Sequence, residues 1–338
     1  MDSIDKDNIL DVKNLKISFR TDEGIVTAVD GVNFSVSKGK TLGLVGESGS
    51  GKSVSTWAIM KLLPHNAIIH EESSILLRRK DGSIVDVTKL SSSNHLIENI
   101  RGGDVSIVFQ EPMSSLAPVY TIGNQISEAI IKHRGVSKQE AKEIAIEMLK
   151  RVGIPDPHRR FNEYPFELSG GMRQRAMIAI ALCTHPSLLI ADEPTTALDV
   201  TIQAQVLELI KELQSELKMS TIFITHNMGV IAQIADEVAV MYLGAIVERA
   251  PCNIIFHNPK HPYTINLLRA IPRLGRGRDQ HLIPISGMVP GPFDRPPGCR
   301  FHPRCEKMIK GLCDVYKPET IEIDENHTVS CFLYSDSI

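Results

Sequence analysis

The sequence predicts an α/β fold with a doubly wound parallel sheet, and three observations support this. An apolar run from Thr41 to Val45 leads directly into a glycine-rich loop. A helical pattern from Val54 to Leu63 follows that loop. Further apolar runs occur at 188–191, 221–225 and 237–242, and a helical pattern over about 200–218 separates the first two. Buried strands that alternate with helices are typical of a parallel sheet covered on both faces.

The bulk properties indicate a globular protein with more than one domain. The chain has 338 residues, whereas one domain typically has roughly 100–200. The formal net charge of -3 provides no general basic surface for nucleic acid, so we expect no nucleic-acid partner. The N-terminus lacks the basic and apolar regions of a secretory signal, and the most apolar stretch, 222–247, is interrupted by charged and polar residues. We therefore expect a cytosolic protein whose association with any membrane is peripheral.

The remaining pattern indicates how the chain is divided. Residues 65–104 are polar and turn-rich, with a short strand predicted at 83–87. The pattern over 122–152 is helical, and Ser137 and Glu140 form a capping box that opens a second helix there. Beyond Pro251 the composition shifts to proline, histidine, arginine and cysteine. We expect a nucleotide-binding domain over 1–250, with a helical subdomain over about 111–168, and a C-terminal extension over 251–338.

A phosphate-binding motif, GxxxxGK[ST], occupies residues 46–53 between the predicted strand and helix. Its glycines let backbone N–H groups point at phosphate oxygens near a helix N-terminus. Lys52 supplies a mobile positive charge, and the hydroxyl of Ser53 can ligate Mg²⁺. The predicted ATP-binding residues here are Gly46, Ser48, Gly49, Ser50, Gly51, Lys52, Ser53 and Val54.

Two adjacent carboxylates, Asp192 and Glu193, end the apolar run that begins at Leu188. Successive strand residues face opposite sides, so the two side chains can have different roles. Asp192 suits the Mg²⁺ shell, and Glu193 suits the general base that takes a proton from the attacking water.

A second loop suited to anions precedes the apolar helix that runs to about Thr184. Ser169 is followed by Gly170 and Gly171, a serine and glycine pattern typical of a helix N-terminus. The stretch Glu167-Leu-Ser-Gly-Gly-Met-Arg-Gln-Arg175, just upstream of the Asp-Glu pair, resembles the signature sequence of ABC ATPases. The resemblance implies an ABC core with antiparallel β and helical subdomains. It also implies a dimer in which the signature of one subunit acts on ATP held by the other.

Four further residues match elements of that family in the family's order. Gln110 matches the glutamine that contacts Mg²⁺ and connects to the membrane partner, and Asp199 matches the aspartate of the loop at the dimer interface. His226 matches the histidine that contacts the γ-phosphate and orients the water, and Phe19 matches the aromatic residue that stacks on adenine. The resemblance covers about residues 19–226. It implies Glu193, His226 and Gln110 as catalytic residues and Ser53, Gln110 and Asp192 as Mg²⁺ ligands.

The segment His261-Pro-Tyr-Thr-Ile-Asn-Leu-Leu-Arg-Ala-Ile-Pro272 resembles the region that follows the ATPase domain in dipeptide and oligopeptide importer subunits. The resemblance implies an ATP-hydrolysing subunit that powers peptide import from the cytoplasmic face of the plasma (inner) membrane. It implies a second, related ATPase chain, two permease subunits and an extracytoplasmic solute-binding protein as partners. An importer of nickel chelates or other small solutes is the alternative. A soluble ABC ATPase that acts on ribosomes or DNA, and a redox or regulatory protein centred on the cysteines, are more remote.

Four of the six cysteines lie near the C-terminus, at Cys299, Cys305, Cys313 and Cys331. A reducing compartment disfavours disulfides, and four thiolates suit either a tetrahedral zinc ion or an iron–sulfur cluster. The spacing alone decides between neither metal. Similarity to the peptide importer subunits implies one [4Fe-4S] cluster, which would hold together a proline-rich segment with little core of its own.

Overall fold

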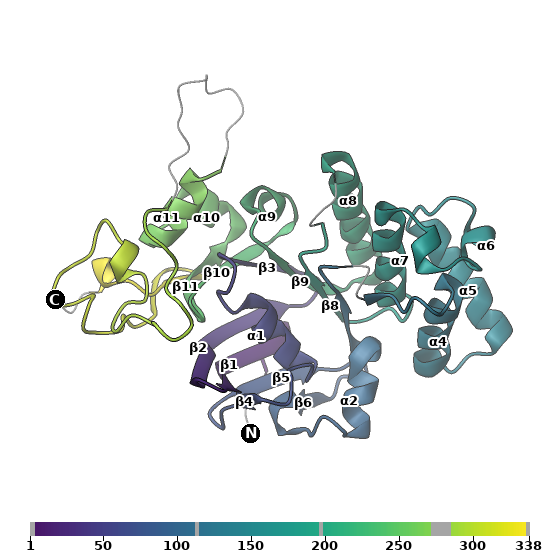
Figure 1. Cartoon of the computed structure of the whole chain (residues 1–338), viewed down its shortest axis with the longest axis horizontal. Coiled ribbons are helices and arrows are strands. Elements are labelled where there is room, and N and C mark those ends of the chain that lie inside the picture. Colours follow the sequence, from purple (N-terminus) through teal and green to yellow (C-terminus); the bar gives the residue numbers. More distant parts are fainter. Residues whose placement is uncertain (1–3, 112–114, 196–198, 272–284, 336–338) are drawn as a thin grey trace, which may run out of the picture. The chain divides into compact units, whose positions relative to one another are not determined.

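The structure is a computed structural model that describes residues 4–111, 115–195, 199–271 and 285–335. Two compact units are formed by chain segments that are far apart in the sequence. The first unit contains the residues up to Leu10, Val36–Lys40 and Leu77–Ile222. The second contains Asp11–Ser35, Thr41–Leu76 and the chain from Phe223 onward. The elements of both are labelled in Figure 1.

The strands of the first unit include a parallel pair. Strand β7 (Val105–Val108) pairs with β8 (Leu188–Asp192) so that Val105 lies opposite Leu188. Every residue of β8 is buried, as the apolar run at 188–191 predicts. The short strand β6 covers Ile84–Asp86, within the strand predicted at 83–87. Helices α2 (His95–Asn99) and α8 (Val200–Leu217) also belong to this unit.

A group of helices forms the other part of the first unit (Figure 1). They are α4 (Ile122–Arg134), α5 (Lys138–Arg151), α6 (Pro157–Arg160) and α7 (Gly170–Leu182). The predicted helical pattern over 122–152 is broken at Gly135, whose φ of 66° lies in the left-handed region. The next helix begins where the hydroxyl of Ser137 accepts the backbone N–H of Glu140 at 3.2 Å. The buried positions of α4 and α5 recur at helical spacing, so one face of each helix packs inward.

A mixed sheet organises the second unit. Strand β10 (Glu237–Tyr242) lies between β3 (Thr41–Val45), to which it is parallel, and β11 (Ala245–Pro251), to which it is antiparallel. The predicted bounds of β3 and β10 are confirmed. Near the C-terminus, β13 (His327–Val329) pairs with β11, and β12 (Ile321–Asp324) pairs with β13. The C-terminal segment therefore continues the sheet that contains β3.

A second sheet of this unit is built around β1, whose pairing with β4 is antiparallel. Strand β1 (Asn8–Thr21) lies between β2 (Gly24–Ser37) and β5 (Ser74–Arg78), and β4 (Ala67–Ile69) also pairs with β1. Helix α1 covers Lys52–Ile59 and ends earlier than the predicted Leu63, because Lys61 adopts a left-handed φ of 52°. The other helices of the unit are α9 (Met228–Ile234), α10 (Cys252–His257) and α11 (Pro262–Arg269).

Short turns complete the secondary structure. Single turns of 3₁₀ helix cover Val87–Lys89, Pro165–Glu167, His302–Arg304 and Phe332–Tyr334, and an irregular π-helical turn covers Ile100–Asp104. Among the helices within the described ranges, none has the length and apolarity needed to cross a membrane.

Candidate nucleotide site and cysteine segment

The phosphate loop follows β3 and requires glycine at two close approaches. Gly46 has a φ of 152°, and a Cβ at this position would lie 2.1 Å from the carbonyl oxygen of Met241. Gly51 has a φ of 98°, and its Cβ would lie 2.9 Å from the carbonyl oxygen of Ala28. Any other residue would therefore push the loop away from the neighbouring backbone.

Lys52 lies at the first position of α1, with its side chain folded over the loop. Its ammonium donates to the carbonyl oxygens of Gly46 and Glu47, both at 2.9 Å, and to the hydroxyl of Ser50 at 3.3 Å. Ser53 and Val54 follow in the first turn of the helix. Ser48 and Gly49 are exposed on the loop. This arrangement suits phosphate, since the positive end of a helix and a mobile cation converge on one short loop.

The predicted catalytic carboxylate lies directly after β8. Asp192 is the last residue of the strand and is buried, with 5% of its surface exposed, whereas Glu193 is half-buried. The side-chain amide of Gln110 donates to the carboxylate of Glu193 at 3.1 Å. Glu193 also has a φ of 46°, a left-handed conformation that is uncommon for residues other than glycine. Two residues predicted from separate motifs therefore meet at this strand end.

The signature loop and the aspartate loop each begin a helix. The hydroxyl of Ser169 accepts the backbone N–H of Met172 at 3.3 Å and caps α7, and Gly170 and Gly171 form its first turn. Asp199 caps α8 by accepting the backbone N–H of Ile202 at 3.0 Å. Residues 196–198 of the predicted aspartate loop lie outside the described residues. Pro272, the last residue of the segment that resembles peptide importer subunits, also lies outside them. Ser169, Gly170 and Asp199 are exposed.

Two further predicted residues of the nucleotide site, like those of the phosphate loop, belong to the second unit. His226 follows β9 (Ser220–Thr225) and is exposed, immediately before Asn227, which caps α9. Phe19 lies on β1 opposite Ala67 of β4 and is half-buried.

The four C-terminal cysteines are electrostatic neighbours. Burial raises the pKa of Cys299 and of Cys331 to about 11, and the charges of Cys305 and Cys313 add to both increases. Burial also raises the pKa of Cys305, and the charge of Cys313 contributes to this shift. The backbone N–H of Cys299 donates to the carbonyl oxygen of Cys313 at 2.8 Å. Among the residues that the structure describes, no three or more His, Cys, Asp or Glu side chains are arranged to hold a metal ion. The thiols thus lie in one neighbourhood but not in the geometry of a metal site.

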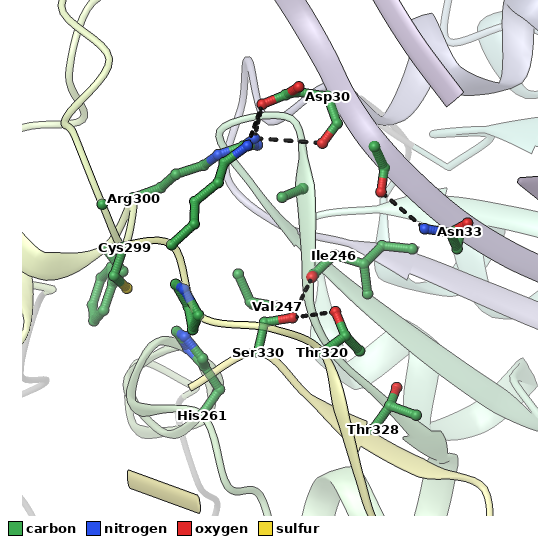
Figure 2. A pocket seen from close by; sticks show the side chains of 16 residues that line it. Asp30, Asn33, Ile246, Val247, His261, Cys299, Arg300, Thr320, Thr328 and Ser330 are labelled. Atoms are coloured by element: carbon green, nitrogen blue, oxygen red, sulfur yellow. Dashed lines mark hydrogen bonds and ion pairs between the residues drawn. The ribbon is translucent and has the colours of Figure 1, made fainter. Parts of the chain in front are cut away.

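A cavity of about 500 Å³ adjoins Cys299, and three cations meet one carboxylate at its edge. Figure 2 shows Arg300 reaching Asp30, which also accepts from Arg295 at 3.2 Å and from Lys317 at 2.9 Å. Burial would raise the pKa of Asp30, but the hydrogen bond from Lys317 and the charges of the two arginines outweigh it and hold this pKa below its usual range. Arg300 also donates to the carbonyl oxygen of Leu243 at 2.7 Å, so this cluster anchors the cysteine segment.

Two long-range side-chain contacts were not predicted from the sequence. Glu47 of the phosphate loop pairs with Arg304, and Glu248 of β11 hydrogen-bonds His327 of β13. Their partners are 257 and 79 residues apart in the chain. The sequence carries only one signal for the first pair, a charged residue at a variable position of the phosphate motif.

A phosphate loop between a parallel strand and a helix, together with a strand that ends in two carboxylates, defines a nucleotide-hydrolysing ATPase of the P-loop class. The family model described as ABC transporter matches residues 29–196, and the one described as oligopeptide/dipeptide transporter, C-terminal region, matches residues 247–313. The dipeptide transport ATP-binding protein DppD of Bacillus subtilis (strain 168) is 48% identical over 328 residues, which cover 97% of this chain and 95% of that protein. The oligopeptide transport ATP-binding protein OppD of the same strain is 47% identical over 325 residues, 96% of this chain and 88% of that protein.

Among solved structures, the ATP-binding cassette MJ0796, a dimer in a post-hydrolysis state bound to ADP and Pi, is similar with a TM-score of 0.62. It is 27% identical and covers 72% of this chain and 98% of its own. The chain belongs to the family of ABC transporter ATP-binding subunits. It is therefore an ATPase that uses ATP and Mg²⁺, and the predicted α/β ABC fold is confirmed.

Proposed function

We propose that the chain powers the import of dipeptides or oligopeptides through an ABC transporter. The assignment of peptides as the transported solute rests on the match of residues 247–313 to the oligopeptide/dipeptide transporter C-terminal region. Relatives that cover nearly the whole chain are named for dipeptide and oligopeptide transport, which supports the same class. Import of nickel chelates or other small solutes is the alternative that an uptake experiment must distinguish.

The catalytic roles follow from the chemistry of the residues. Lys52 and the loop amides would offset phosphate charge, and Phe19 would stack on adenine. Ser53, Asp192 and Gln110 are the side chains suited to hold Mg²⁺, which supplies charge neutralisation on the phosphate oxygens. Glu193 would accept the proton of the attacking water, and its contact with Gln110 at 3.1 Å supports a fixed orientation for that task. His226 would orient the same water.

Assembly into a pair would complete each site. Ser169, Gly170 and Gly171 at the exposed start of α7 would act on ATP bound to the partner, and Asp199 would lie at the interface. The partner would be a related but different ATPase chain. Closure of the pair on ATP would be transmitted to two permease subunits through Gln110 and the helical subdomain over about 111–168. An extracytoplasmic binding protein would deliver the solute, and the ATPase pair would lie on the cytoplasmic face of the plasma (inner) membrane.

Residues 1–250 would form the ATPase domain and 251–338 the C-terminal extension. Cys299, Cys305, Cys313 and Cys331 would ligate one [4Fe-4S] cluster that holds this extension together. Their mutual electrostatic influence supports a common site, although no three of the described His, Cys, Asp or Glu side chains are arranged to hold a metal ion in this structure. Burial favours the neutral thiols, so binding of the metal would also have to displace their protons.

Uptake of labelled peptide by cells that lack this chain tests the function. The wild-type chain should restore ATP-dependent uptake of a labelled dipeptide or tetrapeptide, and the Lys52→Ala variant should not. A nickel chelate supplied at the same concentration serves as the competing solute. Restored nickel uptake without peptide uptake would favour the alternative, and peptide uptake that is equal with Lys52→Ala would contradict the ATP-driven role.

A further inference from the structure

The second residue of the phosphate loop, Glu47, is held by the C-terminal segment. The guanidinium of Arg304 donates two hydrogen bonds to its carboxylate, from Nη1 to Oε2 at 2.7 Å and from Nη2 to Oε1 at 3.0 Å. The Arg304 side chain is 4% exposed and that of Glu47 is 26% exposed. A two-point contact between an arginine and a carboxylate fixes orientation as well as distance.

Arg304 is itself fixed by its surroundings. Its Nε donates to the carbonyl oxygen of Ser286 at 3.1 Å, and its Nη1 also donates to the hydroxyl of Tyr242 at 3.3 Å. The guanidinium lies 5.8 Å from the centre of the Tyr242 ring and 6.0 Å from that of Phe301. These contacts leave the side chain little freedom, so the position of Glu47 depends on where the segment around Arg304 lies.

The backbone of Glu47 is held from the same side. Its N–H donates to the hydroxyl of Tyr263 on α11 at 2.9 Å. Tyr263 is fully buried, and its ring packs against those of Tyr242 at 4.7 Å and Phe301 at 5.3 Å between centroids. The carbonyl oxygen of Glu47 meanwhile accepts from Lys52. Every polar group of Glu47 thus has a partner, and two of those partners come from the chain beyond residue 260.

We propose that Arg304 and Tyr263 are positioning residues that hold the phosphate loop in its ATP-binding shape, so that the C-terminal segment sets the affinity for ATP. The inference rests on the assignment of residues 46–53 as the ATP site. A loop already held in place loses less conformational entropy when it binds, so releasing Glu47 weakens binding. Neither residue acts on the reacting atoms, so the rate at saturating ATP stays unchanged.

The structural alternative is that these contacts only anchor the C-terminal segment to the rest of the second unit. Arg300 provides a matched control for it. It is a buried arginine of the same segment, 6% exposed, and its bonds go to Asp30 and Leu243 rather than to Glu47. A variant at Arg300 disturbs the anchoring of the segment without altering a partner of Glu47.

The test compares three variants of the full-length chain, Tyr263→Phe, Arg304→Lys and Arg300→Lys. Tyr263→Phe keeps the packed ring and removes only the acceptor for the N–H of Glu47. MgATP binding to each purified chain is measured by titration, and KM and kcat are measured on the assembled transporter. We expect affinity to fall about five-fold for Tyr263→Phe and about ten-fold for Arg304→Lys, with matching increases in KM and unchanged kcat. Arg300→Lys should bind ATP like the wild type.

Three results would overturn the inference, and the experiment separates their causes. Wild-type affinity in Tyr263→Phe and Arg304→Lys would show that the contacts are structural only. An equal loss of affinity in Arg300→Lys would assign the effect to loosening of the whole segment. No ATP binding by the wild-type chain would contradict the assignment of the phosphate loop itself. If Arg304→Lys fails to fold, Tyr263→Phe still provides the test, because it removes one oxygen atom.

Discussion

Gln110 and Glu193, which lie 83 residues apart in the chain, meet side chain to side chain at 3.1 Å. Each follows one strand of the parallel pair β7 and β8, so the sheet itself brings them together. The side-chain amide of Gln110 donates to one carboxylate oxygen of Glu193. This contact joins the residue proposed to sense Mg²⁺ to the residue proposed as the general base.

Replacing Glu193 by Gln should abolish hydrolysis and leave ATP binding intact. Glutamine has the shape of glutamate but accepts no proton, and a general base typically contributes about 10²–10⁴-fold to the rate. Single-turnover hydrolysis and MgATP titration of the variant and the wild type measure the two effects separately. Lys52→Ala is the matched comparison, because it should lose binding itself. Undiminished turnover in Glu193→Gln would remove Glu193 from the catalytic role.

The buried hydrogen bond between Glu248 and His327 should contribute strongly to stability. Glu248 is fully buried and accepts from the backbone N–H groups of Lys260 at 2.7 Å and His261 at 2.9 Å, as well as facing Nε2 of His327 at 2.9 Å. Glu248→Ala would leave these three donors without an acceptor, and each buried donor left unsatisfied costs about 1–3 kcal/mol. Denaturant unfolding measures this difference in the free energy of unfolding.

Two further variants calibrate that prediction. Glu248→Gln keeps one acceptor oxygen and should lose less stability than Glu248→Ala. Glu322→Ala, at an exposed position of β12, should change the free energy of unfolding by no more than about 0.5 kcal/mol. Equal stability of Glu248→Ala and the wild type would mean that water replaces the carboxylate, and the pair would then have no role in holding β13 to β11.

The cysteine segment should contain iron when the protein is purified without oxygen. A [4Fe-4S] cluster predicts about four irons and four sulfides per chain. Cys305→Ser should lower both contents together, whereas Cys252→Ser, outside the group of four, should leave them unchanged. Metal and sulfide analysis of the three proteins measures this. Stoichiometric zinc without iron would replace the cluster by a zinc site. The absence of both metals would leave four thiols, two of them buried, that hold the segment by packing.

The elements that the sequence predicts well are those that depend on local pattern. The bounds of β3 and β10 follow from unbroken apolar runs. The phosphate motif, the Asp192-Glu193 pair and the helix cap at Ser137 are each formed by residues that are close together in the chain. Such features need no knowledge of distant neighbours. The end of α1 was placed too late, because the left-handed turn at Lys61 has no glycine to mark it.

The contacts that the sequence does not predict all join distant segments. A three-residue strand such as β13, with the sequence His-Thr-Val, is too short to show alternation, so its pairing with β11 has no local signal. Similarly, Arg304 stands out in the sequence only as one cation among cysteines and prolines. Its bond with Glu47 depends on how α11 and the segment after it return to the phosphate loop. Such contacts between distant segments have no local sequence pattern from which they could be predicted.

The buried histidine His261 should make stability depend on pH. Its Nδ1 accepts the backbone N–H of Tyr263 at 3.1 Å and caps α11, and complete burial lowers its pKa to about 3. In the unfolded chain its pKa is about 6.5, so between these values the unfolded state binds a proton that the folded state does not. The contribution of His261 to the free energy of unfolding is therefore fully present above about pH 6.5, and it falls by about 1.4 kcal/mol per pH unit below that value.

The variant His261→Asn isolates this contribution. Asparagine is equally able to cap a helix but does not titrate, so the free energy of unfolding should depend less steeply on pH, by about one proton, between pH 4.5 and 6.5. Burial also lowers the pKa values of His133 and His185, but both remain in each protein and cancel in the comparison. The variant should be less stable at neutral pH, because the smaller side chain leaves space beside the ring of Phe301. Denaturant unfolding across this pH range measures both effects. Parallel curves for the two proteins would mean that His261 is protonated in the folded state, in which case its ring could not accept the N–H of Tyr263.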